Sequence, residues 1–323
     1  MNKVFITGIS GSGGSYLAEY ILDNYANISV SGATRWHSTT SFNNLEKIKK
    51  NIKLYECDLT DLSSIIRTLQ IVKPENIYHL AAFANVRAAF DTPLAVINNN
   101  VMGTANLLEA CRLVCPECKI MMCSTSEVYG NPKVLPMTEE HPLEPVNPYS
   151  VSKLAGDRLA YCYFKSWGLP IITSRAFAYI NPRRGELFST AFAKQIALIE
   201  AGKQLILKHG NLDSIRTIID VRDMCGAYCL LMERGDVGEV YNIGGTDVLT
   251  VGEFLDLLKD NSNCEIRCEQ DPKLMRPVDL TRQICDATKF IKKTNWKPRY
   301  SIEDSIDFLL DHVRKEVIND SRR

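Results

Sequence analysis

The sequence lacks both an excess of charge and any long apolar run. Lys and Arg together number 38, as do Asp and Glu, so the formal net charge is zero. A nucleic-acid-binding protein usually carries a basic excess, and a membrane helix needs roughly 18 consecutive apolar residues. The first apolar stretch, residues 4–6, is also too short for the core of a secretion signal. We therefore expect a cytoplasmic protein with no nucleic-acid partner and no membrane partner.

Metal-ligand motifs are also scarce, although the chain has 11 cysteines. Cys115-Pro-Glu-Cys118 is one CxxC pair, whereas a zinc site usually needs a second pair or histidines at suitable spacing. Cys123 follows the apolar residues 120–122, so its side chain is expected to point into a core. We expect free thiols in a reducing compartment and no metal site.

What the sequence does have is an alternation of short apolar strands and amphipathic helices. The periodicity predicts strands at 3–7, 28–33, 52–55, 76–79, 119–123 and 170–174. It predicts helices at 15–25, 60–72, 93–113 and 148–167 between them. Repeated β-α-β units predict an α/β fold, a doubly wound parallel sheet of the Rossmann type with helices on both faces.

The rhythm changes near residue 176, after which the elements are shorter and are separated by Gly, Pro and Asn. We predict a dinucleotide-binding domain over residues 1–176, to which the chain returns near 217–244. Residues 177–323 are predicted to form mainly a smaller α/β lobe that binds the substrate. The 323 residues are enough for a core of this size.

A glycine-rich loop lies between the first strand and the first helix. Gly8, Gly11 and Gly14 take the GxxGxxG spacing, with Ser12 and Gly13 inside it. Glycines permit a tight turn and let backbone N–H groups approach a pyrophosphate, which the helix N-terminus also attracts. The position between strand and helix predicts a dinucleotide site, and the alternative is a glycine turn that binds nothing.

The end of the second strand favours NADP over NAD. An NAD enzyme usually has Asp or Glu there to bind the ribose 2′-hydroxyl, whereas this chain has Arg35. The planar guanidinium can pair with a 2′-phosphate, unless Arg35 is only a solvated loop charge. Asp58, after the third strand, is a candidate for the adenine end or a helix cap, or both.

Tyr149 and Lys153 are four residues apart on a predicted helix, which places them on one face. A nearby ammonium lowers the pKa of a phenol, so Tyr149 could remove a hydroxyl proton near neutral pH. Residues 124–130, Ser-Thr-Ser-Glu-Val-Tyr-Gly, come directly after another predicted strand, where the active sites of α/β enzymes gather.

Together, TGxxGxxG, the Ser/Thr segment and YxxxK resemble the extended short-chain dehydrogenase/reductase family over essentially the whole chain. Thr-Ser-Glu-Val-Tyr-Gly resembles its sugar-nucleotide 4,6-dehydratase branch, and the GDP-mannose 4,6-dehydratases most of all. Epimerases of the family commonly lack an acid where Glu127 stands. Residues 181–185, 210–213 with Arg216, and Arg276-Pro277 also resemble segments of those dehydratases.

The resemblance implies an NADP-dependent lyase that converts a GDP-hexose to a 4-keto-6-deoxy sugar, with transient internal hydride transfer. Tyr149 would act as base at the 4-hydroxyl, beside Lys153 and Thr125, and Glu127 would act at C5 and C6. The implied cofactor-binding residues are Gly8, Gly11, Ser12, Gly13, Gly14, Arg35, Asp58, Leu59, Ala81, Ala82, Asn100, Tyr149 and Lys153. The implied substrate-binding residues are Asn85, Ser126, Arg184, Arg216 and Arg276.

The family also implies a homodimer or homotetramer, paired through the helices after Pro93 and Pro148. Arg183 could serve a subunit contact, because the Arg-Arg loop of the GDP-mannose enzymes reaches a neighbour's cofactor site.

Three departures from the GDP-mannose enzymes indicate a different hexose. Residues 83–85 are Phe-Ala-Asn where Gln-Ser-His is usual, Ala178 replaces an Asn, and the segment between Arg35 and Asp58 is shorter. GDP-N-acetylglucosamine or a GDP-heptose are examples of such a substrate.

Two rival interpretations of the function remain. The first is a C4 dehydrogenase or epimerase that needs no C5 base. The second is a redox-sensing or scaffold protein that keeps the dinucleotide site and has lost its catalytic activity.

Overall fold

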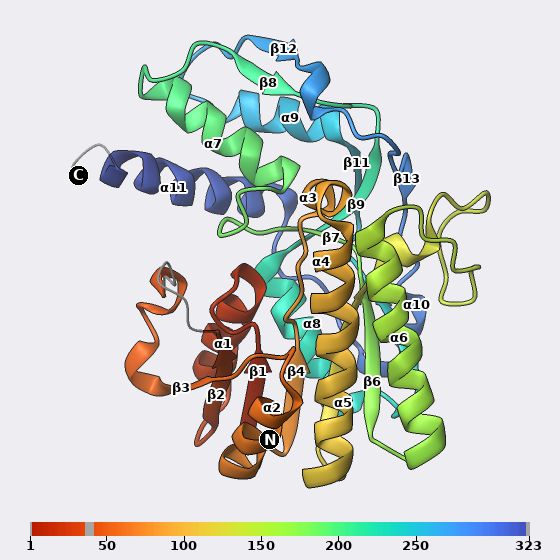
Figure 1. Cartoon of the computed structure of the whole chain (residues 1–323). Coiled ribbons are helices and arrows are strands. Elements are labelled where there is room, and N and C mark those ends of the chain that lie inside the picture. The colour runs from red at the N-terminus through yellow and green to blue at the C-terminus, as the bar shows by residue number, and fades with distance from the viewer. Residues whose placement is uncertain (1, 36–41, 321–323) are drawn as a thin grey trace.

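A sheet of seven parallel strands forms the centre of the computed structural model, which describes residues 2–35 and 42–320 (Figure 1). The strand order is β10-β6-β5-β4-β1-β2-β3. The strands are β1 (Lys3–Thr7), β2 (Ser29–Thr34), β3 (Ile52–Glu56), β4 (Asn76–His79), β5 (Lys119–Thr125), β6 (Ile171–Ala176) and β10 (Val240–Ile243).

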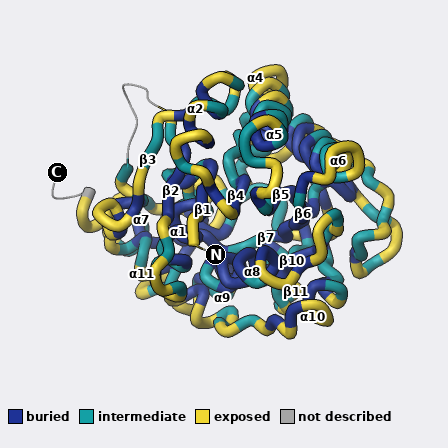
Figure 2. The backbone as a smooth tube through the Cα atoms, turned by 90° about the horizontal axis from the view of Figure 1, so that it is seen from below, coloured by how far each residue is buried: buried dark blue, intermediate teal, exposed yellow. Residues whose placement is uncertain are grey.

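Helices cover both faces of this sheet, because alternate side chains of each buried strand point to opposite faces. Val4 and Ile6 of β1 pack into one core with α1 (Ser12–Asn24) and α8 (Val221–Arg234). Phe5 packs into the other core, beneath α2 (Leu62–Val72), α5 (Gly103–Val114) and α6 (Pro148–Trp167). Seen from below, the strands are largely buried and the outer sides of the helices are exposed (Figure 2).

The second lobe has its own sheets and core. Its larger sheet contains β7 (Ala178–Ile180), β9 (Ile215–Asp220), β11 (Asp247–Thr250) and β13 (Arg282–Gln283). The smaller sheet pairs β8 (Leu207–His209) with β12 (Cys268–Gln270). Helices α7 (Phe188–Glu200), α9 (Val251–Asp260) and α11 (Ile302–Asp320) pack against them.

The chain leaves the second lobe at β9 and re-enters the first through α8 and β10, which pairs with β6. The predicted fold class, a doubly wound parallel sheet with a smaller α/β lobe, is confirmed. The residue limits of the two domains stay a prediction.

Two helices differ from their predicted bounds. α1 begins at Ser12, three residues earlier than predicted, because Gly13 and Gly14 form part of its first turn. The predicted helix over 93–113 is observed as α4 (Pro93–Ile97), a π-helical segment η3 (Asn98–Met102) and α5. The sequence did not predict α3 (Val86–Asp91), which is only 6 residues long.

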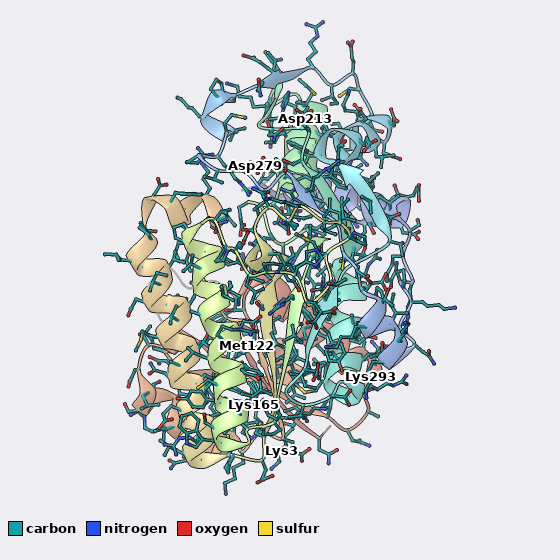
Figure 3. All side chains as sticks on the ribbon, turned by 90° about the vertical axis from the view of Figure 1, so that its right-hand side faces the viewer. Lys3, Met122, Lys165, Asp213, Asp279 and Lys293 are labelled. Carbon is teal, nitrogen blue, oxygen red and sulfur yellow. The ribbon has the colours of Figure 1, made fainter. Side chains whose placement is uncertain are left out.

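The carboxyl ends of the central strands face the second lobe. Lys3, at the start of β1, lies at one end of the molecule, and Asp213 and Asp279 of the second lobe lie at the other (Figure 3). The strand order reverses at β1, which is flanked by β2 and β4. In open α/β sheets the crevice at such a reversal is where ligands bind.

Candidate active site

The glycine loop follows the carboxyl end of β1 and packs against the segment after β4. Gly8 has a φ of +74°, and a Cβ there would lie 2.9 Å from the Cα of Ala81. A Cβ on Gly14 would overlap the carbonyl oxygen of Gly8. Gly11, the N-cap of α1, offers no side chain to cap the helix. The first N–H groups of α1 are therefore available to an anion such as a pyrophosphate.

A buried network fixes this loop from below. The side chain of Thr7 lies 2.8 Å from His79 Nδ1 and accepts a hydrogen bond from the backbone of Ala81 at 3.2 Å. His79 Nε2 lies 2.9 Å from the hydroxyl of Thr104. Burial, with the nearby charge of Lys153, lowers the pKa of His79 to about 3. The imidazole is therefore neutral at physiological pH, and its contacts connect β1, β4 and α5.

The residues predicted for the adenosine end lie beyond β2 and β3. Arg35 follows β2, and its guanidinium donates to the side chain of Asn99 at 3.3 Å. Asp58 accepts from the backbone and the hydroxyl of Thr60, which closes the turn before α2, while Asp61 is the N-cap of that helix. Leu59 packs against Gly103 of α5.

Asn100, which was predicted to bind the cofactor, is held by protein partners. Its side chain is bonded to both backbone groups of Phe83 and donates to the hydroxyl of Ser152 at 2.9 Å. These bonds tie the segment of Ala81 and Ala82 to the catalytic helix α6. A cofactor contact of Asn100 stays a prediction.

Tyr149 and Lys153 lie on the first turns of α6, and both are buried. Burial raises the pKa of Tyr149, and the largest opposing effect comes from the Arg184 guanidinium, while Glu127 raises it further. Burial lowers the pKa of Lys153, against the opposing effects of Cys123 and Asp157. The sequence predicts Lys153 as the activating charge, whereas in this structure the main charge that lowers the pKa of Tyr149 is that of Arg184.

Glu127 lies in the short helical turn η4 (Ser126–Tyr129) directly after β5. Thr125 ends β5 and caps this turn by accepting from the Glu127 N–H at 3.3 Å. The Glu127 carboxylate accepts a hydrogen bond from the side-chain amide of Asn147 at 2.9 Å. Thr125 and Ser126 are both buried.

Arg216 and Arg276 of the second lobe lie within electrostatic range of each other. Arg216, on β9, is largely buried beside Asp279, and burial lowers its pKa. The charges that act on its pKa include Glu127 and Arg276, so Arg216 lies within electrostatic range of the predicted catalytic acid and of the other predicted phosphate ligand. Arg276 itself is exposed.

Arg184 occupies a different place from the other two arginines. It donates to the carbonyl oxygen of Ala84 at 2.7 Å and to Glu186 at 3.0 Å, beside the phenols of Tyr149 and Tyr179. The position beside the predicted catalytic phenol favours a role toward Tyr149 over the predicted contact with the diphosphate. Direct substrate binding by Arg184 stays a prediction.

Arg183 is committed to its own chain. It donates to Ser15 at 2.9 Å and to Glu19 at 2.6 Å, and its guanidinium stacks 3.9 Å from the ring centre of Tyr16. With its side chain only 9% exposed, these bonds favour a structural role within the chain, and a subunit contact of Arg183 stays a prediction. Asn85 is likewise used locally, as the N-cap of α3.

Sequence reasoning missed two residues of this site. Asn147 precedes Pro148 at the start of α6, and this Asn-Pro pair is an N-terminal signal that could have indicated a buried cap. The hydroxyl of Tyr179, on β7, would lie 3.4 Å from a Cβ placed on Gly13, so it faces the glycine loop. No local pattern distinguishes Tyr179 from a core tyrosine.

Of the cysteines, Cys123 lies within electrostatic range of Tyr149 and Lys153. The side chain of Cys123 is only partly buried, with its sulfur 3.3 Å from the hydroxyl of Tyr228. Over residues 2–35 and 42–320, no cluster of three or more His, Cys, Asp or Glu is arranged to bind a metal ion, and no helix is long and apolar enough to span a membrane. A cavity of about 1070 Å³ lies between α1, α8 and α11, lined by Tyr20, Arg222 and Phe308 among others, away from Tyr149 and Glu127.

Comparison with known proteins decides the family. The model of the family GDP-mannose 4,6 dehydratase matches residues 5–308. The chain belongs to the GDP-mannose 4,6-dehydratase family. The resemblance inferred from Thr-Ser-Glu-Val-Tyr-Gly and YxxxK is thereby confirmed.

Relatives in this family of enzymes match nearly the whole chain. A human GDP-mannose 4,6 dehydratase is 30% identical over 94% of this chain and 89% of its own length. A GDP-6-deoxy-D-mannose reductase from Pseudomonas aeruginosa is 31% identical over 98% of both. The chain spans 60% of a longer relative that is also 30% identical, the GDP-mannose 4,6-dehydratase sdnI of Sordaria araneosa.

Solved structures share the fold and were determined with different dinucleotides. RMD from Pseudomonas aeruginosa, complexed with NADPH, has a TM-score of 0.83 at 27% identity and covers 98% of this chain and 100% of its own. A dTDP-glucose 4,6-dehydratase from Bacillus anthracis, in complex with NAD, has a TM-score of 0.84 at 26% identity, covering 98% and 97%.

Proposed function

We propose that the protein is an NADP-dependent GDP-hexose 4,6-dehydratase, a lyase that forms a 4-keto-6-deoxy sugar. One observation carries the proposal: the Glu127 carboxylate lies within electrostatic range of both the Tyr149 phenol and Arg216 of the second lobe. A base for the C4 hydroxyl, an acid-base group and a phosphate ligand thus meet at the carboxyl edge of the sheet. A C5 acid-base group is what a dehydratase needs beyond C4 oxidation.

The residues of the first lobe fit a dinucleotide. The uncapped N-terminus of α1 and the glycine loop suit a pyrophosphate, and Arg35 suits a 2′-phosphate. Within the described part of the chain, the buried ammonium of Lys153 has no hydrogen-bond partner, which suits a ribose hydroxyl. The NADPH-bound structure from Pseudomonas aeruginosa supports NADP, although NAD-bound neighbours exist. When bound, the nicotinamide would accept hydride from C4 of the sugar and later return it to C6.

Tyr149 and Thr125 would act on the C4 oxygen. The Tyr149 phenolate removes the proton of the 4-hydroxyl as hydride leaves the same carbon, which converts the alcohol to a ketone. Thr125, held at the end of β5, donates a hydrogen bond to that oxygen. The Arg184 cation would stabilise the phenolate, and Lys153, one turn further along α6, is our candidate for a second stabilising charge.

Glu127 would carry out the loss of water. The C4 ketone acidifies the C5–H bond, and the carboxylate takes this proton. The C6–O bond then breaks, and the proton passes from Glu127 to the departing hydroxyl, which leaves as water. As hydride returns to C6, Glu127 would deliver a solvent-derived proton to C5, and Tyr149 would release to solvent the proton taken from the 4-hydroxyl, so the net change is the loss of one water per sugar.

Arg216 and Arg276 are our candidates for the diphosphate of a GDP-sugar, since arginine pairs with phosphate through two hydrogen bonds. The family supports GDP as the nucleotide. Phe83 and Ala84 pack beside Tyr149 where the family usually has polar residues, and Ala178 also lacks a polar group. These apolar side chains favour a hexose other than mannose, such as N-acetylglucosamine.

A second candidate is a C4 reductase or epimerase on GDP-sugars. The reductase from Pseudomonas aeruginosa matches this chain over its full length, which favours this alternative. It would use Tyr149 and Lys153 but would need no acid-base group at C5, so the hydrogen-bonded Glu127 favours the dehydratase.

A panel of sugar nucleotides tests the proposal. The protein is incubated with NADP and GDP-, UDP-, dTDP- and CDP-hexoses, and products are read by mass spectrometry. We expect a GDP-hexose to lose one water with no net change in NADPH absorbance. Net consumption of NADPH on a 4-keto sugar would instead identify a reductase, and inversion at C4 without water loss an epimerase.

For assembly, we propose a homodimer formed through α4, α5 and α6, or a tetramer built from it. Exposed apolar side chains lie on these helices, including Leu94 at 82% exposure, Leu113, Val151 and Tyr161. Light scattering of the purified protein would measure its oligomeric state.

All eleven cysteines are free thiols, which supports a cytoplasmic location.

A further inference from the structure

Asn147 lies between the catalytic helix and Glu127 and bonds to both. Its side-chain oxygen accepts from the Ser150 N–H at 2.8 Å, which caps the N-terminus of α6. Its side-chain nitrogen donates to Glu127 Oε2 at 2.9 Å. Asn147 is 5% exposed, so neither bond competes freely with water.

The capping role alone does not require asparagine. Ser, Thr and Asp cap a helix about as well, because each supplies an oxygen acceptor. Only the amide supplies a donor on the same side chain, and the donor is what reaches Glu127. The cap fixes the oxygen on the helix, so the nitrogen must point away from it, toward the carboxylate.

This arrangement also determines which oxygen of Glu127 is free. Oε2 is occupied by the amide, whereas within the described part of the chain Oε1 has no hydrogen-bond partner. Tyr149 is two residues after Asn147 on the same helix. The amide therefore couples the position of the C5 acid-base group to the helix that carries the C4 base.

We propose that Asn147 is a positioning residue for the dehydration half of the reaction. It holds the Glu127 carboxylate by one oxygen and leaves the other free for the C5 proton and the C6 hydroxyl. C4 oxidation depends on Tyr149 and is expected to be independent of this bond. The inference rests on the proposed function and adds a residue whose loss separates its two halves.

The informative variant is Asn147→Ser, which keeps a cap and removes the donor. We expect water loss and the exchange of the C5 hydrogen with deuterated solvent to slow by about 10- to 100-fold, as for a misplaced catalytic group. Transient NADPH absorbance from C4 oxidation, and KM, are expected to stay within about twofold of wild type. Asn147→Asp also keeps the cap but places an anion beside Glu127, so it should impair the same step at least as strongly.

Ser150→Ala is the matched control. The Ser150 hydroxyl accepts from the Asn147 N–H at 3.3 Å and completes the capping box without touching Glu127. This variant should lower the melting temperature and leave the ratio of dehydration to C4 oxidation unchanged. Melting curves of all three variants show whether each one is folded.

Selective loss of the C5 step in both Asn147 variants, with an unchanged ratio in Ser150→Ala, supports the inference. Equal loss of both steps, or wild-type dehydration in Asn147→Ser, overturns it and leaves the proposed function standing. A wild-type protein that dehydrates no sugar nucleotide overturns the proposed function and this inference together.

Discussion

The cofactor end and the sugar end of the active site are built in different ways. The cofactor end is made mainly of backbone, a glycine loop and an uncapped helix N-terminus, and it rests on the buried side-chain network of Thr7, His79 and Thr104. The sugar end is made of side chains from separate segments, with Glu127 after β5, Tyr149 on α6 and Arg216 on β9. Under the proposed function, the first would bind a dinucleotide, with Arg35 favouring NADP, and the second would determine what happens to the sugar.

Replacing Tyr149 with Phe should have the largest effect, because it removes the C4 base while keeping the ring that packs against Phe83. We expect turnover to fall by about 10²- to 10⁴-fold, the usual contribution of a general base. Affinity for NADP and the melting temperature should change little. The measurement is steady-state turnover on the GDP-hexose found by the panel. A variant that retains more than about a tenth of the wild-type rate would show that the sugar end does not depend on this phenol.

Replacing Arg35 with Ser tests whether one side chain adds specificity to the backbone-built cofactor end. Charge-assisted hydrogen bonds contribute about 1.5–3 kcal/mol, so the Kd for NADP should rise about 10- to 100-fold. The Kd for NAD should stay the same, because NAD has no 2′-phosphate. Isothermal titration with both dinucleotides gives the two values. An equal change for NADP and NAD would remove Arg35 from cofactor selection.

His79 makes the cofactor end sensitive to acid. Its pKa is about 3 in the fold against an ordinary value of 6.5, so below pH 6.5 the unfolded chain takes up a proton that the folded chain does not. Its contribution to stability is present above pH 6.5 and is lost as the pH falls, by up to about 1.4 kcal/mol per pH unit. Urea unfolding from about pH 7 to 4.5 should show a shallower decline for His79→Gln than for wild type. Identical slopes would exclude His79 as the cause.

Replacing Arg184 with Met should have the smallest effect. It should shift the pH dependence of kcat/KM without abolishing activity. The guanidinium opposes the rise in the Tyr149 pKa caused by burial, so its removal should raise that pKa further. The alkaline rise of kcat/KM should then move to higher pH. Glu186→Gln, which removes a partner of Arg184 and keeps its charge, is the control and should leave the profile in place. A lower affinity for the sugar nucleotide with an unmoved profile would favour the diphosphate role instead.

The same difference explains what the sequence could predict. Gly8, Gly11 and Gly14 are local to one turn, so their spacing between a strand and a helix predicted both their conformation and their place. The short apolar run of β1 likewise predicted a strand buried on both faces.

Contacts between distant segments had no local signal. Arg184 and Tyr149 are far apart in sequence, and their approach depends on where the fold places the loop after β7. Arg183 and Arg184 are neighbours of one residue type, yet one stacks on Tyr16 and the other lies beside Ala84. The hydrogen bond from Asn147 to Glu127 also joins two segments that only the fold brings together.

A single-turnover experiment on Glu127→Gln tests the central claim most directly. Glutamine keeps the shape of the side chain but cannot take the C5 proton. With NADP and the GDP-hexose, we predict that absorbance from NADPH appears and persists, while no water is lost and no solvent deuterium enters C5. Dehydration at the wild-type rate in this variant would contradict the account.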